Sequence, residues 1–208
     1  MTGKTLALAA FALALAGGGC SMIGGAALSD AQQVIADMNI GPSDLTVLGG
    51  VDRADRAYRA GEPIALSVEV NQPAYVAVLR VMRSGATTLI FPDRKHPDAR
   101  LAANAPLRLA APASGDQASG DQEGPVLFEF IAAKTGGSWL FSRKPAGSAA
   151  FAELGATTRA LARDIVDSLK PGPAHATAAA HIVVHVSARS TTGRHAPQKI
   201  LASPPGSA

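Results

Sequence analysis

Two histidines on one predicted strand are the residues of this chain best suited to binding a metal ion. His181 and His185 share one face of an apolar run and lie four residues apart. At ~3.3 Å per residue this spacing spans roughly 13 Å of extended chain, which is too far for two imidazoles to share one ion. His175 and His195 lie in segments without a regular pattern. We therefore expect exposed histidines, no metal site and no cofactor.

Known catalytic patterns are missing from the rest of the chain. The sequence has no Gly-x-Ser-x-Gly elbow, no His-Glu-x-x-His motif, no Gly-x-x-x-x-Gly-Lys-Ser/Thr loop and no Gly-x-Gly-x-x-Gly loop. Glu129 is the single charge in an apolar run at 125–133. A carboxyl there could act as an acid with a raised pKa, but we favour an edge or solvent-facing position. We expect no catalytic residue and interpret the chain as non-enzymatic.

Cys20 is the one cysteine of the chain, so no internal disulfide can form. Lys4 precedes an apolar run at 5–16, which has the length of a signal-peptide core and is too short to span a bilayer. Small residues at 17–19 lie directly before Cys20. This arrangement resembles the lipobox of bacterial lipoproteins, in which the thiol is lipidated and becomes the mature N-terminus. Gly17 stands where such boxes usually carry Leu.

The lipobox resemblance implies a signal peptide over 1–19 and a lipidated tether over 20–30. Ser21 after the cysteine resembles the pattern that sorts lipoproteins to the outer membrane of diderm bacteria. We therefore expect a periplasmic protein that is anchored to the outer membrane by the lipid on Cys20. A plain secretory cleavage near Ala27 or Ser29 is the alternative.

Composition limits the classes of partner. The chain has 208 residues, of which 47% are hydrophobic and only 4% aromatic, and its formal net charge is +3. The basic residues are scattered and few aromatic residues lie among them, whereas a nucleic-acid groove needs both charge and stacking faces. We expect no nucleic-acid binding. Removal of 19 residues leaves 208 − 19 = 189 residues, which suits one domain.

The strongest strand pattern lies within 58–93. Apolar residues alternate over 64–70, which indicates a strand with one buried face. The segment 74–82 is apolar on both faces, as in a central strand, and Ser84-Gly85 offers a hairpin turn into a third strand at 86–91. These three consecutive strands predict a meander.

Other segments complete a mainly β fold with flanking helices. We predict a short helix from Ser29-Asp30, a short strand over 45–48 that ends at Gly49-Gly50, and a clear strand over 125–133. Helical spacing of apolar residues predicts an amphipathic helix over 151–169, and alternation predicts a last strand over 180–188. The expected fold is an antiparallel, immunoglobulin-like β-sandwich packed by this one C-terminal helix. We expect a single domain over 31–189, with its core at 45–135, and a disordered tail over 190–208.

Three further segments allow a functional interpretation beside a structural one. Trp139 and Phe141 form an apolar cluster that either packs over the core or marks a partner surface. Acids and bases alternate over 52–59, and we favour local salt bridges over an ion-binding patch. Ser-Gly-Asp-Gln occurs twice within 113–124, where we favour a flexible loop over a calcium loop because the spacing matches no full calcium pattern.

Three short motifs resemble a known family. The segments are GEPI at 61–64, AYV at 74–76 and, after Gly85, LIFPD at 89–93. They resemble the bacterial domain-of-unknown-function family 4384 over about residues 45–135. The resemblance implies an extracytoplasmic, β-sandwich-like accessory domain and brings no catalytic residues with it.

Together these observations favour a non-catalytic envelope lipoprotein whose domain binds or scaffolds an envelope protein or glycan. One alternative is a structural subunit of an envelope or secretion assembly, in which the Trp139 cluster and the tail would be buried. The other alternative is an uncharacterised periplasmic enzyme.

Overall fold

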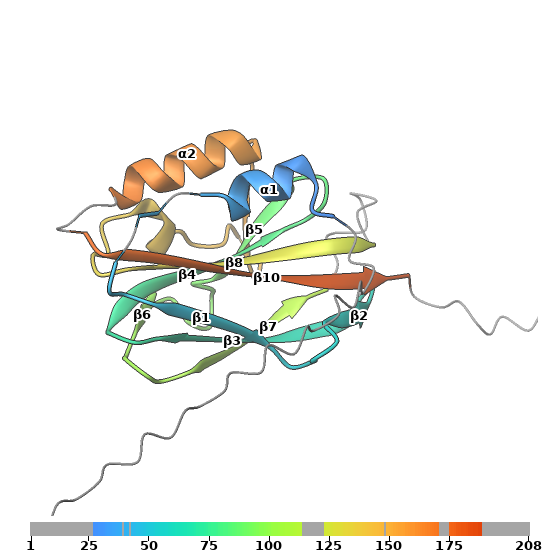
Figure 1. Cartoon of the computed structure of the whole chain (residues 1–208), viewed down its shortest axis with the longest axis horizontal. Helices are drawn as coiled ribbons and strands as arrows, with labels where there is room; N and C mark the ends of the chain where they lie inside the picture. Colours follow the sequence, from blue (N-terminus) through green and yellow to red (C-terminus); the bar gives the residue numbers. More distant parts are fainter. Residues whose placement is uncertain are drawn as a thin grey trace, which may run out of the picture.

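The alternating apolar segments form two β-sheets that pack face to face, with helices on the outer face of the larger sheet (Figure 1). This computed structural model describes residues 27–38, 40–41, 43–113, 123–147, 149–170 and 175–188. The elements in chain order are α1 (Asp30–Ala36), β1 (Val47–Val51), β2 (Ala57–Arg59), β3 (Pro63–Val70), β4 (Ala74–Val81), β5 (Thr87–Phe91), β6 (Arg100–Leu101), β7 (Leu107–Pro112), β8 (Gly124–Ala133), the 3-10 helix η2 (Trp139–Phe141), β9 (Ala152–Leu154), α2 (Thr158–Leu169) and β10 (Thr177–Ser187).

The two sheets have different sizes. The small sheet has the order β1-β3-β7, and the large sheet has the order β2-β10-β8-β4-β5-β9, with β6 paired to β4. All of these pairings are antiparallel except that of β10 with β2, which is parallel. The predicted mainly β, sandwich-like fold is confirmed, and the parallel β2 pairing is the exception to its expected antiparallel character.

Two apolar cores lie on opposite faces of the large sheet. In β8, Phe128 and Phe130 point between the sheets, while Leu127 and Ile131 point toward the helices. This separation follows from the period of two in a strand, and the strand predicted over 125–133 is confirmed as β8. The strand β4 lies between β8 and β5, which confirms its predicted central position, and its two faces are buried in the two cores.

The predicted meander is wrong, because β3 and β4 belong to different sheets. The chain turns a corner at 71–73, where Asn71 Oδ1 accepts a hydrogen bond from Thr46 N–H at 2.8 Å and Asn71 Nδ2 donates to Asp44 O at 2.8 Å. These bonds hold the corner against the segment before β1. Only the β4–β5 hairpin remains of the meander, and its turn contains Gly85 at φ +93°.

The C-terminal helix is shorter than the predicted 151–169. Thr157 caps α2 by accepting a hydrogen bond from Ala160 N–H, and residues 152–154 form β9 instead. In β9 the buried Ala152 and Leu154 alternate with the exposed Glu153, which is the period of a strand. The segment pairs with β5 in an antiparallel arrangement. The last strand also differs slightly, since it spans 177–187 where 180–188 was predicted.

The sheet is packed by α1 as well as by α2, so the prediction of one packing helix was incomplete. Ser29 and Gln32 form a capping box at the start of α1. Gln32 is fully buried, and its Nε2 donates to Val81 O at 3.0 Å and to Pro125 O at 2.8 Å, which ties α1 to β4 and β8. Within the described part of the chain, neither helix has the length and hydropathy that a membrane span requires.

Candidate functional site

A cavity of about 560 Å³ opens at the side of the sandwich where both sheets end. Among the described strands, β7 is the last of the small sheet and β9 is the last of the large sheet. Three segments far apart in the sequence line the cavity, which we call the edge cleft: the loop after β5, part of β7, and the two residues before β9. The lining residues are Asp93, Arg94, Lys95, His96, Arg108, Leu109, Ala110, Ala150 and Phe151. A cavity of this size accommodates a small molecule or a short segment of a partner.

One wall of the edge cleft is a loop closed by its own hydrogen bonds. Asp93 Oδ1 accepts a hydrogen bond from His96 N–H at 2.6 Å and lies 3.0 Å from His96 Nδ1. The Asp93 N–H donates in turn to His96 O at 3.1 Å. The loop follows the LIFPD segment, whose Phe91–Pro92 peptide bond is cis. The carboxylate of Asp93 is therefore engaged within the loop.

The charges that line the edge cleft are mainly positive. Arg94, Lys95 and Arg108 are exposed cations, and Asp93 is the one carboxylate among the described residues of the lining. Three positive charges and one negative charge give a formal net charge of 3 − 1 = +2. The guanidinium of Arg94 donates a hydrogen bond to Gly147 O, which joins the loop to the segment before β9. The lining therefore favours an anionic group over a cationic one.

The floor of the edge cleft is apolar. Leu109 is buried and belongs to the core between the sheets, and Phe151 is half-buried and packs against that core. Ala110 and Ala150 add small exposed surfaces beside them. An apolar surface beside a few charged side chains is typical of a binding site.

Sequence reasoning did not find these residues. Arg94 and Lys95 lie in a polar connector, Arg108 is one exposed residue of a strand, and Phe151 was placed at the start of the helix. The available signal was the pair Arg94-Lys95 directly after the LIFPD segment. Nothing in the sequence indicates that β7 meets this pair.

A buried arginine joins the strands that border the edge cleft. Arg80 of β4 is 4% exposed, and its Nη1 donates to Pro112 O in the small sheet at 3.1 Å. Its Nη2 donates to Thr88 Oγ1 at 3.0 Å, and the Thr88 hydroxyl donates to the Glu153 carboxylate of β9. The arginine thus spans the two sheets and fixes β7 relative to β9 through hydrogen bonds to charged groups, which are stronger than neutral ones.

Glu129 lies in the middle of the large sheet, so its predicted edge or solvent-facing position is wrong. It pairs with Leu79 of β4 on one side and with His181 of β10 on the other, and it is 1% exposed. Its Oε2 has no hydrogen-bond partner among the described residues. Burial raises the pKa of Glu129 to about 9, because an apolar environment disfavours the charged form. The carboxyl is therefore neutral at pH 7.

The strand histidines do not form a metal site in the structure. His181 and His185 lie on β10, and the side chain of His181 is 47% exposed, with Nδ1 4.0 Å from Glu129 Oε2. Within the described residues no group of three or more His, Cys, Asp or Glu side chains lies close enough to hold a metal ion. His175 is described at the start of the last segment, and His195 lies outside the described residues.

The Trp139 cluster mostly packs over the core. Leu140 and Phe141 are buried, and the Phe141 ring lies 5.9 Å from that of Tyr75. Trp139 is half-buried and lines a smaller cavity of about 270 Å³ together with residues of α2. Of the two residues proposed as a partner surface, only Trp139 therefore has substantial exposed area.

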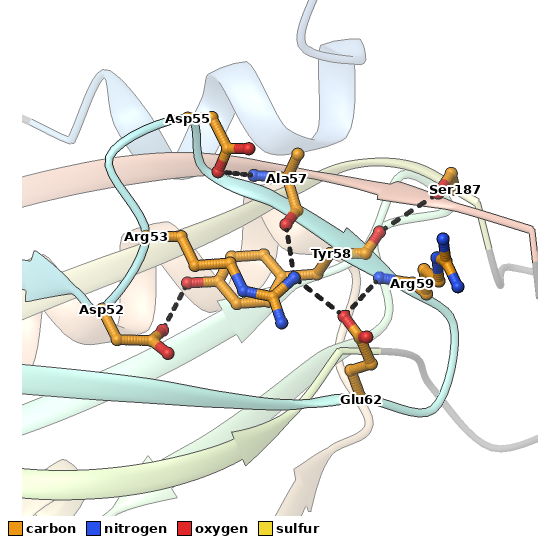
Figure 2. A network of polar contacts seen from close by, with 8 residues as sticks. All are labelled: Asp52, Arg53, Asp55, Ala57, Tyr58, Arg59, Glu62 and Ser187. Atoms are coloured by element: carbon orange, nitrogen blue, oxygen red, sulfur yellow. Dashed lines mark hydrogen bonds and ion pairs between the residues drawn. The ribbon is translucent and has the colours of Figure 1, made fainter.

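The charged run at 52–59 forms a local network around Tyr58 (Figure 2). The Tyr58 hydroxyl donates to Asp52 Oδ1 at 2.6 Å, and the Arg53 guanidinium stacks on the Tyr58 ring at 4.7 Å. Arg53 Nη1 also donates to Ala57 O and forms an ion pair of 3.0 Å with Glu62. Figure 2 shows these side chains directed toward one another, which is the arrangement of a structural network.

The contribution of Tyr58 to stability can be tested through its hydrogen bond to Asp52. Burial, followed by the hydrogen bond to Asp52, raises the pKa of Tyr58 to about 12, and that same bond lowers the pKa of Asp52 below 3.8. We expect Tyr58→Phe to lower the free energy of unfolding by about 1 kcal/mol at pH 7. Because the bond favours ionised Asp52, this loss should shrink as the pH falls below 3.8 and Asp52 takes up its proton. Urea unfolding at pH 7 and pH 3 measures it, and equal losses at both pH values would contradict the assignment.

Several predicted features lie outside the described residues. They are the signal peptide over 1–19, the lipidation site Cys20, the repeated Asp residues at 116 and 121, and the tail over 190–208. The part of the predicted tether that is described includes Leu28, which packs against the helix-side core.

One family model matches part of the chain. Residues 57–133 match the family model described as domain of unknown function (DUF4384). The match spans β2 to β8, and thus the loop after β5 and the strand β7 that line the edge cleft. No curated protein and no solved structure matches the chain.

Proposed function

We propose that this chain, whose residues 57–133 match the DUF4384 family model, is a non-catalytic accessory protein of the bacterial envelope whose β-sandwich binds an envelope protein or glycan. The signal peptide over 1–19 is removed, Cys20 is lipidated, and the lipid anchors the protein on the periplasmic side of the outer membrane. The domain then works at the end of the short tether as a binding or scaffolding module.

The observation that carries this proposal is the edge cleft. It combines exposed cations with an apolar floor, and the buried Arg80 network fixes the two strands that border it. A site that is preformed in this way loses little conformational entropy on binding. Asp93 and His96 are engaged in hydrogen bonds that fix the loop, and Lys95 is an exposed cation. These groups suit binding better than acid–base catalysis.

In-cell crosslinking of the tagged protein, followed by purification and identification of the crosslinked species, tests the proposal. The binding function predicts a defined envelope protein or glycan crosslinked to the wild type. A structural subunit would instead co-migrate with a large membrane complex. Loss of a measured activity after one polar substitution that leaves the fold intact would favour an enzyme, and recovery of an uncrosslinked cytoplasmic monomer would contradict the proposal.

The lipid anchor is tested by a single substitution. We expect Cys20→Ala to abolish incorporation of radiolabelled palmitate and to move the protein from the membrane fraction to the soluble fraction, because no second cysteine can accept the lipid. Gly17→Leu is the matched variant, since it places the usual residue in the lipobox and should preserve or increase labelling. Equal labelling of wild type and Cys20→Ala would contradict lipidation at this site.

A further inference from the structure

We propose that the edge cleft binds an extended acidic peptide segment, which adds a strand to the edge of β7 that no other described strand covers. This inference rests on the proposed function and selects a protein partner over a glycan. It assigns the affinity to backbone hydrogen bonds along β7 and the specificity to the cations beside it.

The first argument is the free edge of β7. On one side β7 pairs with β3 in an antiparallel register, from Val68 opposite Leu107 to Pro63 opposite Pro112. On the other side no described strand pairs with it. An edge strand presents a row of unpaired N–H and C=O groups to any extended chain that approaches. Strand addition to such an edge is a common mode of peptide recognition.

The second argument is the charge beside this edge. Arg108 belongs to β7 itself, while Arg94 and Lys95 belong to the loop after β5, and all three line the edge cleft. An extended segment along β7 would therefore have cations from two separate segments of the chain beside it. Alternate side chains of such a segment point in the same direction about 6.6 Å apart, so acidic residues at every second position could meet these cations.

The third argument is the floor of the edge cleft. Leu109, Ala110 and Phe151 add apolar surface to the same lining as the cations. The peptide side chains that alternate with the acidic ones would contact this apolar surface, so small aliphatic residues suit the positions between the acidic residues. Among the described lining residues Phe151 is the one Phe, Tyr or Trp, and it is half-buried, so these residues offer little of the flat aromatic surface that sugar rings stack on.

The test uses a fluorescent, end-blocked peptide that alternates aspartate and valine, titrated with the full-length protein in detergent and followed by fluorescence anisotropy. We expect saturable binding that weakens with added salt, because exposed charges are screened. A lysine–valine peptide of the same length should not bind. The acidic peptide with N-methylated backbone amides should bind at least about tenfold more weakly, because it cannot complete the strand pairing.

Two pairs of variants locate the binding. Arg108→Glu with Lys95→Glu should weaken binding about tenfold or more, since two attractive charges become repulsive. Arg159→Glu with Arg163→Glu is the matched control, because it makes the same change of net charge on the exposed face of α2 and should leave the affinity unchanged. Slower amide hydrogen exchange over 107–111 in the presence of the peptide would place the added strand on β7.

Three results would overturn the inference: equal binding of the N-methylated peptide, equal loss of affinity in the two variant pairs, or binding of an acidic polysaccharide by a protein that does not bind the peptide. The crosslinking experiment separates this failure from that of the proposed function. A partner that is still captured by the Arg108→Glu, Lys95→Glu protein leaves the proposed function standing and removes this site. Peptide binding without any captured envelope partner removes the proposed function and keeps the chemistry of the edge cleft.

Discussion

Glu129→Gln is expected to stabilise the protein, and the gain should grow as the pH rises from 5 to 9. In the folded protein Glu129 is 1% exposed and its pKa is raised to about 9 from an ordinary value of 4.5. The folded state therefore holds a proton that the unfolded state has already released over this range. Glutamine has nearly the same shape and stays neutral at every pH.

The sign of the pH dependence follows from proton binding. Below 4.5 the carboxyl is protonated in both states, so its titration does not affect stability. Between 4.5 and about 9 only the folded state keeps the proton, and each pH unit lowers the free energy of unfolding by about 1.4 kcal/mol. Above about 9 the buried carboxyl ionises and the dependence ends. From pH 5 to 9 the wild type should thus lose several kcal/mol of stability that Glu129→Gln retains.

Urea unfolding of both proteins at single-unit pH steps measures this difference. His181→Gln is the control, because it changes the side chain that lies 4.0 Å from Glu129 Oε2 and leaves the burial of the carboxyl as it is. We expect His181→Gln to keep the wild-type slope between pH 7 and 9 and Glu129→Gln to lose it. Parallel slopes for wild type and Glu129→Gln would show that the carboxyl titrates normally.

Glu129 also illustrates where sequence reasoning ends. The alternation of Val126, Phe128 and Phe130 with Leu127 and Ile131 correctly predicted a strand, and the structure buries both of its faces. In a strand of that kind any charged residue must be buried as well. The exposed position predicted for Glu129 rests on the general rule that charged residues are exposed, and the local apolar pattern argues against it. Arg80 was overlooked for the same reason, since it interrupts the apolar pattern of β4 and spans the two sheets.

The period of two identified the strands but could not assign each strand to a sheet. The corner at 71–73 moves the chain from the small sheet to the large one, and a Pro-containing turn has the same appearance whether it ends a hairpin or crosses between sheets. The edge cleft depends on this assignment. It joins 93–96, 108–110 and 150–151, which come together only because β7 and β9 end their sheets on the same side.

Gly49 shows how a residue that resembles a strand terminator can be required inside a strand. The pair Gly49-Gly50 was predicted to end the strand at 45–48, yet β1 runs through both residues to Val51. A Cβ on Gly49 would lie 2.3 Å from Cε2 of Phe130, whereas a Cβ on Gly50 would approach only the hydroxyl of Ser67. Gly49 therefore lets β1 pack directly on the Phe130 ring in the core between the sheets.

We expect Gly49→Ala to lower the free energy of unfolding by about 1–3 kcal/mol, because the Phe130 ring is fully buried and cannot move aside without disturbing its neighbours. Gly50→Ala is the matched control, since it adds the same methyl group one residue along β1, where the Ser67 hydroxyl can rotate away. Phe130→Leu should recover part of the loss, so that the double variant is more stable than the sum of the single losses predicts. Thermal and urea unfolding of the four variants and the wild type give the coupling between the two sites. Equal effects of Gly49→Ala and Gly50→Ala, or strict additivity with Phe130→Leu, would show that β1 does not depend on this close contact.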